Sequence, residues 1–242
     1  MAVSTPRSKP SEPREAQASR AVPLLENGQR LTREEFERRY DAMPDLKKAE
    51  LIEGVVYVPS PVNHRSHGRP HAHLTCWLGV YEASTAGVEV GDNSSVRLDL
   101  ANMPQPDCSL FIQPEHGGRV RIGEEGYIEG APELVAEVAA SSVSYDLGVK
   151  KDAYRRHGVL EYIVWQVLER KIDWLVSEEG HFKALAPGDD GILRSLVFPG
   201  LWLDPVALLR GDLSAVIATV QRGLDSPAHA EFLVRFEEAR TV

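Results

Sequence analysis

Residues 132–159 have the sequence PELVAEVAASSVSYDLGVKKDAYRRHGV, which contains the strongest structural signal in the chain. Residues 134–139 form a short apolar run that includes one carboxylate, Glu137. Such a run is typical of a strand in the core of a sheet. Burying a lone carboxylate is costly unless a metal ion or a lysine compensates its charge. The sequence therefore predicts a cation beside Glu137.

A helix is predicted directly after this strand. The serines within residues 141–144 are candidates for its N-cap. Asp146, Lys150 and Tyr154 recur every four residues, so they share one face of the helix. The side chain of Lys150 can therefore meet Glu137 on the strand.

Length and composition indicate one sizeable domain with tails. The chain has 242 residues, of which 43% are hydrophobic and 26% charged. A net charge of -9 argues against a surface that coats nucleic acid, so any such contact must be local. Cys76 and Cys108 lack CxxC spacing, which predicts neither a disulfide framework nor a zinc ribbon. Without a long apolar run or a secretory signal, a cytoplasmic location away from membranes is expected.

The chain divides into three predicted segments. Residues 1–29 have almost no periodic apolar positions, which predicts disorder. Residues 30–209 alternate strands and helices without a regular βαβ repeat, and their glycine-rich segment 113–130 is predicted to be a flexible acidic loop. Residues 210–242 have apolar positions at helical spacing, interrupted by Ser226-Pro227, and predict two helices.

Local patterns predict several further elements. Thr32 and Glu35 have the spacing of a capping box at the start of a helix. Apolar residues at helical spacing predict a helix over residues 67–84. Alternating and β-branched positions predict hairpins over residues 49–61 and 160–176.

Acidic residues are expected to gather around the sheet. Glu50 precedes the first hairpin, and Asp107 stands at the mouth of a buried strand. Mg²⁺ commonly takes one or two protein carboxylates together with water and substrate phosphate. A nearby lysine can hold the attacking water or stabilise charge on the phosphoryl oxygens. Asp107, Glu137 and Lys150 would make such a set.

Six motifs occur in a defined order and spacing. They are AELIEG (49–54), SPVNH (60–64), QPD (105–107), PELVAEV (132–138), YDLGVKKDAYRRHGVLEYIV (145–164) and LRSLVFPGLWLD (193–204). In these motifs the sequence resembles the Uma2 family, also called DUF820, of the PD-(D/E)xK nuclease superfamily. The resemblance covers about residues 31–209 and leaves both tails unexplained.

The resemblance implies an α/β (α+β) fold with a restriction-endonuclease-like mixed central sheet flanked by helices. It also implies Mg²⁺- or Mn²⁺-dependent hydrolysis of phosphodiester bonds in nucleic acid, with DNA as the expected substrate. On this view Asp107 and Glu137 bind the metal and Glu50 supports it. Lys150 is then the catalytic lysine, because the usual position two residues after the acid is occupied by Ala139.

The resemblance gives two further residues a supporting role. Tyr154, one helical turn beyond Lys150, is expected to orient the lysine, and His64 is expected at the rim of the active site. A nuclease that cuts two strands is expected to be a homodimer, and the apolar residues of segment 210–242 can supply the interface.

Each candidate also has a structural interpretation. Asp107 can cap a strand in a Pro-Asp turn. Glu137 can form an ion pair with Lys150 or Lys151 without a metal, and Glu53 can serve in place of Glu50. The alternative function is a non-catalytic interaction protein that retains the nuclease fold, which the acidic net charge favours.

Four histidines invite a zinc interpretation. They are His64, His67, His71 and His73. His67 and His71 can face the same way on a helix, but the spacing is not that of an established zinc motif and no third ligand is evident.

Overall fold

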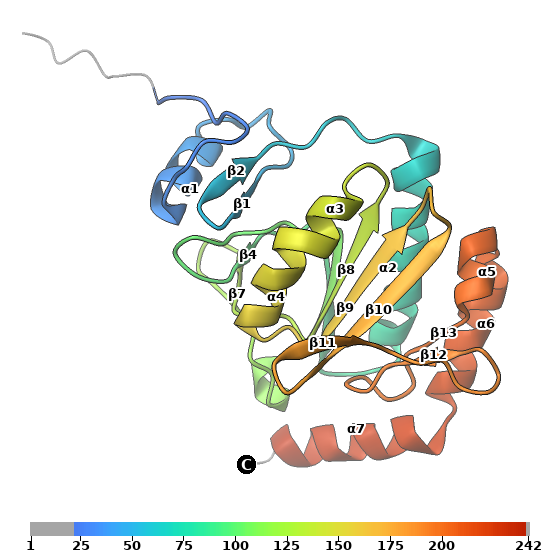
Figure 1. Ribbon diagram of the computed structural model, residues 1–242. Helices are drawn as coiled ribbons and strands as arrows, with labels where there is room; N and C mark the ends of the chain where they lie inside the picture. Colours follow the sequence, from blue (N-terminus) through green and yellow to red (C-terminus); the bar gives the residue numbers. More distant parts are fainter. Residues whose placement is uncertain (1–21, 241–242) are drawn as a thin grey trace, which may run out of the picture.

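A six-stranded mixed sheet lies at the centre of the computed structural model, which describes residues 22–240 (Figure 1). The strand order is β11-β10-β9-β8-β5-β3, with β8 and β9 parallel and the other neighbours antiparallel. The strands are β3 (Val88–Asp92), β5 (Cys108–Ile112), β8 (Leu134–Ala139), β9 (Glu161–Gln166), β10 (Lys171–Glu178) and β11 (His181–Ala184). The predicted mixed α/β fold and the predicted hairpin of β9 and β10 are confirmed.

One face of the sheet is covered by α2 (Arg69–Ala83), which follows directly after the short π-helical segment η1 (His64–Gly68). The apolar side chains at helical spacing, Leu74, Trp77, Leu78 and Tyr81, are all fully buried in the main core. The helix predicted over residues 67–84 is therefore confirmed.

The other face of the sheet is covered by three consecutive helical segments, α3 (Val143–Tyr145), η3 (Asp146–Lys150) and α4 (Lys151–His157). The chain kinks at Gly148, whose φ and ψ are -104° and -109°. Because that ψ lies outside the ordinary helical region, the segment departs from the regular helix that the sequence predicts. Asp146, Lys150 and Tyr154 nevertheless all point into the protein and are buried.

A separate small core lies at the N-terminal side of the described chain. It is formed by α1 (Arg33–Asp41), the hairpin of β1 (Glu50–Ile52) and β2 (Val55–Tyr57), and their surroundings. The Thr32 side chain accepts a hydrogen bond from the Glu35 N–H at 3.4 Å, as predicted for the helix start. Glu53 and Gly54 both have positive φ in the tight turn between the two strands.

Segment 113–130 differs from the predicted flexible loop. It contains η2 (Pro114–His116), β6 (Arg121–Ile122) and β7 (Ile128–Glu129), and β7 pairs with β4 (Val96–Arg97). The Arg97 guanidinium binds Glu125 and Glu129 of this segment together with Glu37 of α1. The prediction was wrong because these glutamates, which resemble a solvated acidic run, are neutralised by an arginine from a distant part of the sequence.

The described parts of both predicted tails pack against the rest of the protein. Residues 1–21 lie outside the described residues. Leu25, however, is buried in the N-terminal core, and the Gly28 N–H donates to the Val56 carbonyl at 2.7 Å. The predicted boundary at residue 30 therefore falls within a packed segment.

The C-terminal part begins with β12 (Leu193–Arg194), β13 (Trp202–Leu203) and α5 (Pro205–Arg210), and continues into two helices. These are α6 (Leu213–Leu224) and α7 (Pro227–Arg240), separated at Ser226-Pro227 as predicted. Their apolar residues Val216, Val220, Phe232 and Phe236 are buried in the main core. These side chains therefore pack against the chain's own domain, so they are not free to form an interface between copies.

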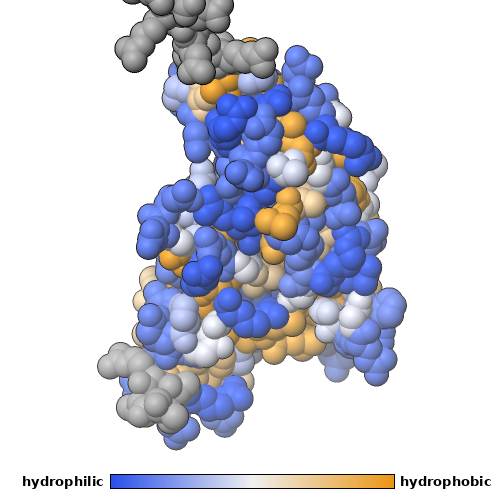
Figure 2. Space-filling view, turned by 90° about the vertical axis from the view of Figure 1, so that its left-hand side faces the viewer, coloured by the Kyte–Doolittle hydropathy of each residue, from blue (hydrophilic) through white to orange (hydrophobic). Residues whose placement is uncertain are grey.

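The surface around α1 is mostly hydrophilic, with small separate hydrophobic areas (Figure 2). Isolated exposed apolar residues are normal for a protein surface. Within residues 22–240, no helix has the length and apolar character needed to cross a membrane.

Candidate active site

The ammonium group of Lys150 lies between two buried carboxylates. Its Nζ is 2.5 Å from Glu137 Oε1 and 2.9 Å from Glu50 Oε1. Asp146 Oδ1 lies further away, at 3.8 Å. The Lys150 side chain is only 2% exposed. The structure therefore brings together the strand acid and helix lysine that the sequence paired.

Asp107 lies directly beside Glu137. Its backbone N–H donates to Glu137 Oε2 at 3.4 Å, and its Oδ2 accepts from the Val138 N–H at 2.8 Å. Lys48 Nζ lies 2.8 Å from Asp107 Oδ1, and His67 Nε2 lies 3.2 Å from Oδ2. Asp107 is therefore held between the backbone of β8 and two side chains that can be cationic.

Sheet pairing explains this arrangement. Cys108 of β5 pairs with Ala136 of β8 in an antiparallel register. The residue before Cys108 must therefore lie opposite the residue after Ala136, which places Asp107 next to Glu137. Glu50 belongs to β1 of the N-terminal hairpin. The Gln105 N–H donates to its Oε1 at 2.8 Å and fixes the position of the carboxylate.

The supporting residues differ from the prediction. The Tyr154 hydroxyl donates to Glu137 Oε1 at 3.0 Å, so this tyrosine orients the acid as well as lying near the lysine. His64 is exposed. It does not line the open cavity beside Asp107 and Glu137, whereas His67 and His71 do. Glu53 forms an ion pair with Arg156 at the surface, so Glu50 alone of these two glutamates reaches Lys150.

These groups line an open cavity of about 650 Å³, here called the active cavity. Its lining includes Glu50, Asp107, Glu137, Asp146 and Lys150. A cavity of this volume lies in the range of roughly 300–1,000 Å³ that is usual for ligand sites. The buried charges can therefore be reached from outside the protein.

Burial and charge shift the acids of the active cavity in opposite directions. Burial raises the pKa of Glu137, although the charge of Lys150 opposes this shift. Burial also disfavours ionised Asp107, but the His67 hydrogen bond and the Lys48 charge outweigh it and lower the pKa of Asp107. Burial opposes the charge of Lys150, yet Glu137 and Glu50 raise its pKa well above the ordinary value. Lys150 is therefore cationic at neutral pH.

The charges of the active cavity suit a divalent cation. Within the described residues, the four acids Glu50, Asp107, Glu137 and Asp146 form ion pairs with two lysines of the cavity, Lys48 and Lys150. The adjacent carboxylates Asp107 and Glu137 provide the one or two protein ligands that Mg²⁺ commonly takes. Glu50 is separated from Glu137 by the bridging ammonium of Lys150 and can act only as a supporting acid while that lysine stays in place.

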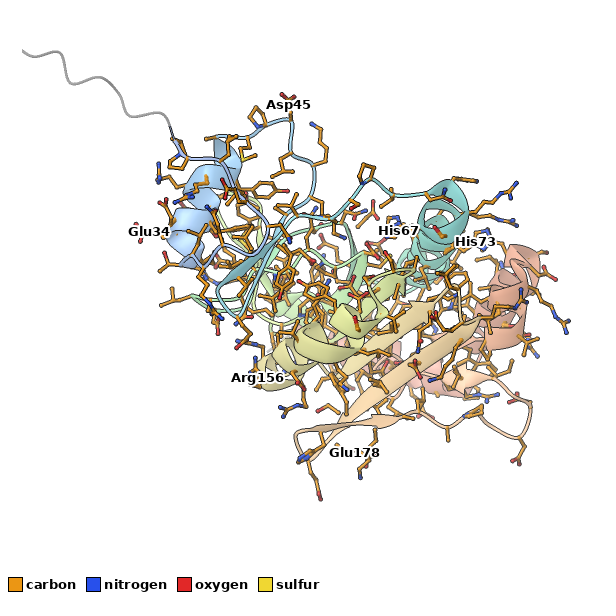
Figure 3. The ribbon with its side chains drawn as sticks, turned by 45° about the horizontal axis from the view of Figure 1, so that its top comes forward. Glu34, Asp45, His67, His73, Arg156 and Glu178 are labelled. Atoms are coloured by element: carbon orange, nitrogen blue, oxygen red, sulfur yellow. The ribbon has the colours of Figure 1, made fainter. Side chains whose placement is uncertain are left out.

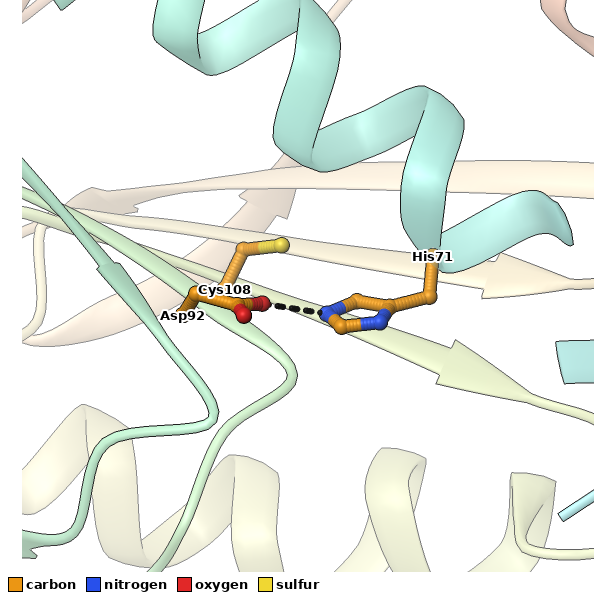
Figure 4. Close-up of side chains that lie close together, drawn as sticks. All are labelled: His71, Asp92 and Cys108. Carbon is orange, nitrogen blue, oxygen red and sulfur yellow. Dashed lines mark ion pairs between the residues drawn. The ribbon is translucent and has the colours of Figure 1, made fainter. Parts of the chain in front are cut away.

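Another group of side chains has the composition of a metal site (Figure 4). In the described part of the chain, His71, Asp92 and Cys108 are the one set of three His, Cys, Asp or Glu ligand atoms that lie within 4.8 Å of one another. His71 Nε2 is already paired with Asp92 Oδ1 at 2.8 Å. Burial raises the pKa of the Cys108 thiol to about 12, which favours the protonated form. The four histidines of the zinc interpretation do not gather into one such set.

The chain matches the sequence profile of the Uma2 family, described as "Putative restriction endonuclease", over residues 33–207. The chain belongs to this family. The fold of the chain is similar to the crystal structure of a protein from Anabaena variabilis ATCC 29413, described as "a putative nuclease belonging to DUF820". The TM-score is 0.50 at 16% identity, over 71% of this chain and 97% of that chain. No curated protein matches the sequence.

The sequence did not reveal two residues of this candidate site, Lys48 and His67. They contact Asp107 across 59 and 40 positions of the sequence. Lys48 follows another lysine before a hairpin, a pattern typical of solvated surface charges. His67 belongs to the group of four histidines for which the sequence suggests a zinc site. The helical spacing of His67 and His71 was the available clue, because it places both on the side that faces the active cavity.

Proposed function

We propose that the chain is a Mg²⁺- or Mn²⁺-dependent endonuclease that hydrolyses phosphodiester bonds in nucleic acid, with DNA as the substrate. The observation that carries this proposal is the Lys150 ammonium, buried between Glu50 and Glu137 at a cavity that also contains Asp107. The family match and the fold likeness to a DUF820 protein support it. We also propose that the enzyme works as a homodimer in the cytoplasm, with one active cavity for each strand.

Asp107 and Glu137 are the residues that would hold the metal ion. When bound, a divalent cation polarises a phosphoryl oxygen and lowers the pKa of a bound water. Neighbouring side chains hold both ligands in position before a metal ion binds. Tyr154 fixes Glu137, and Lys48 and His67 fix Asp107.

Lys150 supplies positive charge where the reacting phosphate enters. Because its ammonium is buried, its charge is less screened than that of a surface lysine and can stabilise the negative charge that develops on the phosphoryl oxygens. Glu50 and Glu137 keep this ammonium in place before the substrate binds. Asp146, on the same helical segment, adds a third, longer contact.

The alternative function is the non-catalytic interaction protein. One observation favours it: Lys150 already has carboxylate partners on several sides, so the cluster is complete as a structural ion-pair network. Under this alternative, replacing the cluster would reduce stability without removing any activity.

The two functions are separated by a cleavage assay. Labelled single-stranded DNA, duplex DNA and RNA are incubated with Mg²⁺ or Mn²⁺ and with wild-type protein, Asp107→Asn or Lys150→Met. We expect metal-dependent cutting by the wild type and none by either variant, with the fold checked by circular dichroism. Absence of cutting on every substrate, together with no metal binding by calorimetry, would support the interaction protein instead.

Glu50 and Glu53 provide a matched pair for the same assay. Both are glutamates of the first hairpin region, but Glu50 contacts Lys150 and Glu53 pairs with Arg156 at the surface. We expect Glu50→Gln to slow cleavage and Glu53→Gln to leave it unchanged. Equal effects would show that the assay reports on the hairpin in general and would remove Glu50 from the proposed site.

A further inference from the structure

A second cavity, of about 190 Å³, lies beside the N-terminal half of α2. Its lining includes Arg65, Arg69, His73, Arg170 and Arg210, and it is here called the arginine cavity. The first three residues come from η1 and α2, Arg170 from the turn between β9 and β10, and Arg210 from the end of α5. It shares no lining residue with the active cavity.

The arginine cavity concentrates positive charge in an acidic protein. Within residues 22–240, none of its four guanidinium groups forms an ion pair with a carboxylate. Arg69 Nη2 donates instead to the Gly211 carbonyl at 3.3 Å, which ties α2 to the end of α5. Like charges in one small cavity repel one another, and a bound anion would relieve this repulsion.

A buried histidine of the same cavity lacks a hydrogen-bond partner among the described residues. His73 is 9% exposed, and its Nδ1 has no hydrogen-bond partner. Unpaired buried polar atoms are rare in native proteins. Burial lowers the pKa of His73, and the charge of Arg69 lowers it further, so the ring is neutral and can donate one hydrogen bond. His73 also lines the arginine cavity, so its ring lies beside an anion bound there.

The size and place of the arginine cavity restrict its ligand. Its volume is below the roughly 300–1,000 Å³ of pockets that enclose small molecules, so it suits a single charged group. His67 and His71 line the active cavity, whereas Arg69 and His73 line the arginine cavity. The two cavities therefore flank one helical segment, on which Figure 3 labels His67 and His73.

We propose that the arginine cavity binds a backbone phosphate of the nucleic-acid strand that is cleaved in the active cavity. The inference rests on the proposed function and adds the path of the strand beside the scissile bond. Planar guanidinium groups match phosphate oxygens in paired hydrogen bonds. Phosphate contacts of this kind set the position of the strand and carry no sequence information. A local basic cavity also explains how a chain with net charge -9 can hold nucleic acid.

The test measures oligonucleotide binding in EDTA, where metal-dependent cleavage cannot occur. Arg65→Gln/Arg170→Gln removes two exposed cations that form no hydrogen bond through their side chains within the described residues. Arg121→Gln/Arg222→Gln is the control, because it makes the same change in net charge elsewhere on the surface. Labelled single-stranded DNA, duplex DNA and RNA are titrated by fluorescence anisotropy at several salt concentrations.

We expect the cavity variant to bind its best oligonucleotide about tenfold more weakly, with a salt dependence lower by about one phosphate contact or more. The control variant should bind like the wild type. Equal weakening in both variants would overturn the proposal, because only overall charge would then matter. Unchanged oligonucleotide binding would also overturn it, even if calorimetry with inorganic phosphate showed a site that the cavity variant lacks.

The cleavage assay separates this inference from the proposed function. With Mg²⁺, the cavity variant should show a raised KM and a nearly unchanged kcat, since it retains the active cavity. Selective loss of oligonucleotide binding in a protein that never cleaves would refute the nuclease activity and still support the phosphate site. A loss of kcat with unchanged KM and unchanged binding would overturn the phosphate site.

Discussion

Glu137 and Glu161 are both buried glutamates on the neighbouring parallel strands β8 and β9, yet their surroundings differ. Glu137 shares Lys150 with Glu50 and opens to the active cavity. Glu161 has no cationic partner among the described residues. It accepts hydrogen bonds from neutral donors: the Trp174 indole, the Ser195 hydroxyl and the backbone N–H groups of Leu196 and Val197.

The difference shows that burial of an acid does not by itself make a site. Burial raises the pKa of Glu161 although its hydrogen-bond donors oppose the shift, and burial likewise raises the pKa of Glu137. Glu161 fixes the turn that follows β12, and it lies outside the active cavity. What distinguishes Glu137 is an adjacent acid, a buried lysine and access from outside. These differences favour the proposed chemical role for Glu137 and a structural role for Glu161.

The largest expected contrast is in cleavage rate. Glu137→Gln removes a proposed metal ligand and should slow metal-dependent cleavage at least about 100-fold. Glu161→Gln should cleave within about threefold of the wild type at a temperature where both are folded, because it touches no group of the active cavity. Single-turnover rates on the same oligonucleotide measure both. A comparable loss in the two variants would remove the distinction between them.

The next contrast is in stability. Lys150→Met leaves Glu50 and Glu137 buried without their cation, which should lower the free energy of unfolding by about 3 kcal/mol. Adding Glu137→Gln to this variant should cost less than the sum of the single changes, because Glu50 is then the one carboxylate of these two that still lacks its cation. Urea denaturation of the wild type, the two single variants and the double variant gives the double-mutant cycle. Additive losses would show that Lys150 and Glu137 do not act as a pair.

Glu161→Gln should give a smaller loss, of about 1–3 kcal/mol, because one amide cannot accept from all four donors. Mg²⁺ should raise the thermal midpoint of Glu161→Gln by as much as that of the wild type, since the proposed metal ligands Asp107 and Glu137 are intact. Differential scanning calorimetry with and without Mg²⁺ gives both quantities. Loss of the Mg²⁺ response would place Glu161 in the metal site and contradict its structural role.

Local sequence patterns were sufficient for β8, for α2 and for the buried side of the lysine-bearing segment, though not for its kink. Apolar spacing does not depend on distant residues, and the order of the acids agreed with a known family. The same patterns could not separate Glu137 from Glu161, since each is one acid in an apolar strand. Their environments are decided by Lys150 on one side of the sheet and by the turn after β12 on the other.

Contacts across long stretches of chain account for what the sequence did not reveal. Lys48 and Asp107 are 59 residues apart, and only the packing of the N-terminal hairpin region against the sheet brings them together. The ordering of segment 113–130 depends in the same way on Arg97. The kink at Gly148 was invisible to a pattern with a spacing of four residues, although it left Asp146, Lys150 and Tyr154 on the buried side.

The smallest expected effect comes from an exposed pair, Asp99 and His157, whose side chains meet at 2.8 Å and are 45% and 18% exposed. Partial burial opposes ionisation of Asp99, but hydrogen bonds from the Ala101 N–H and from His157 outweigh it and lower the pKa of Asp99 below 3.8. Its stabilising contribution is therefore present above about pH 4 and is lost as the pH falls through the lowered pKa.

Asp99→Asn keeps an acceptor for the Ala101 N–H but removes the charge that His157 contacts. Because solvent screens this pair, the variant should lose only about 0.5 kcal/mol or less at pH 7. The difference from the wild type should shrink as the pH falls below 3.8 through the lowered pKa, as measured by urea denaturation at pH 7 and at a series of acidic pH values. A loss as large as that of Lys150→Met would mean that exposure does not separate the surface pair from the buried cluster. A small, acid-sensitive loss would instead leave burial beside a cavity as the property that sets Lys150 and Glu137 apart.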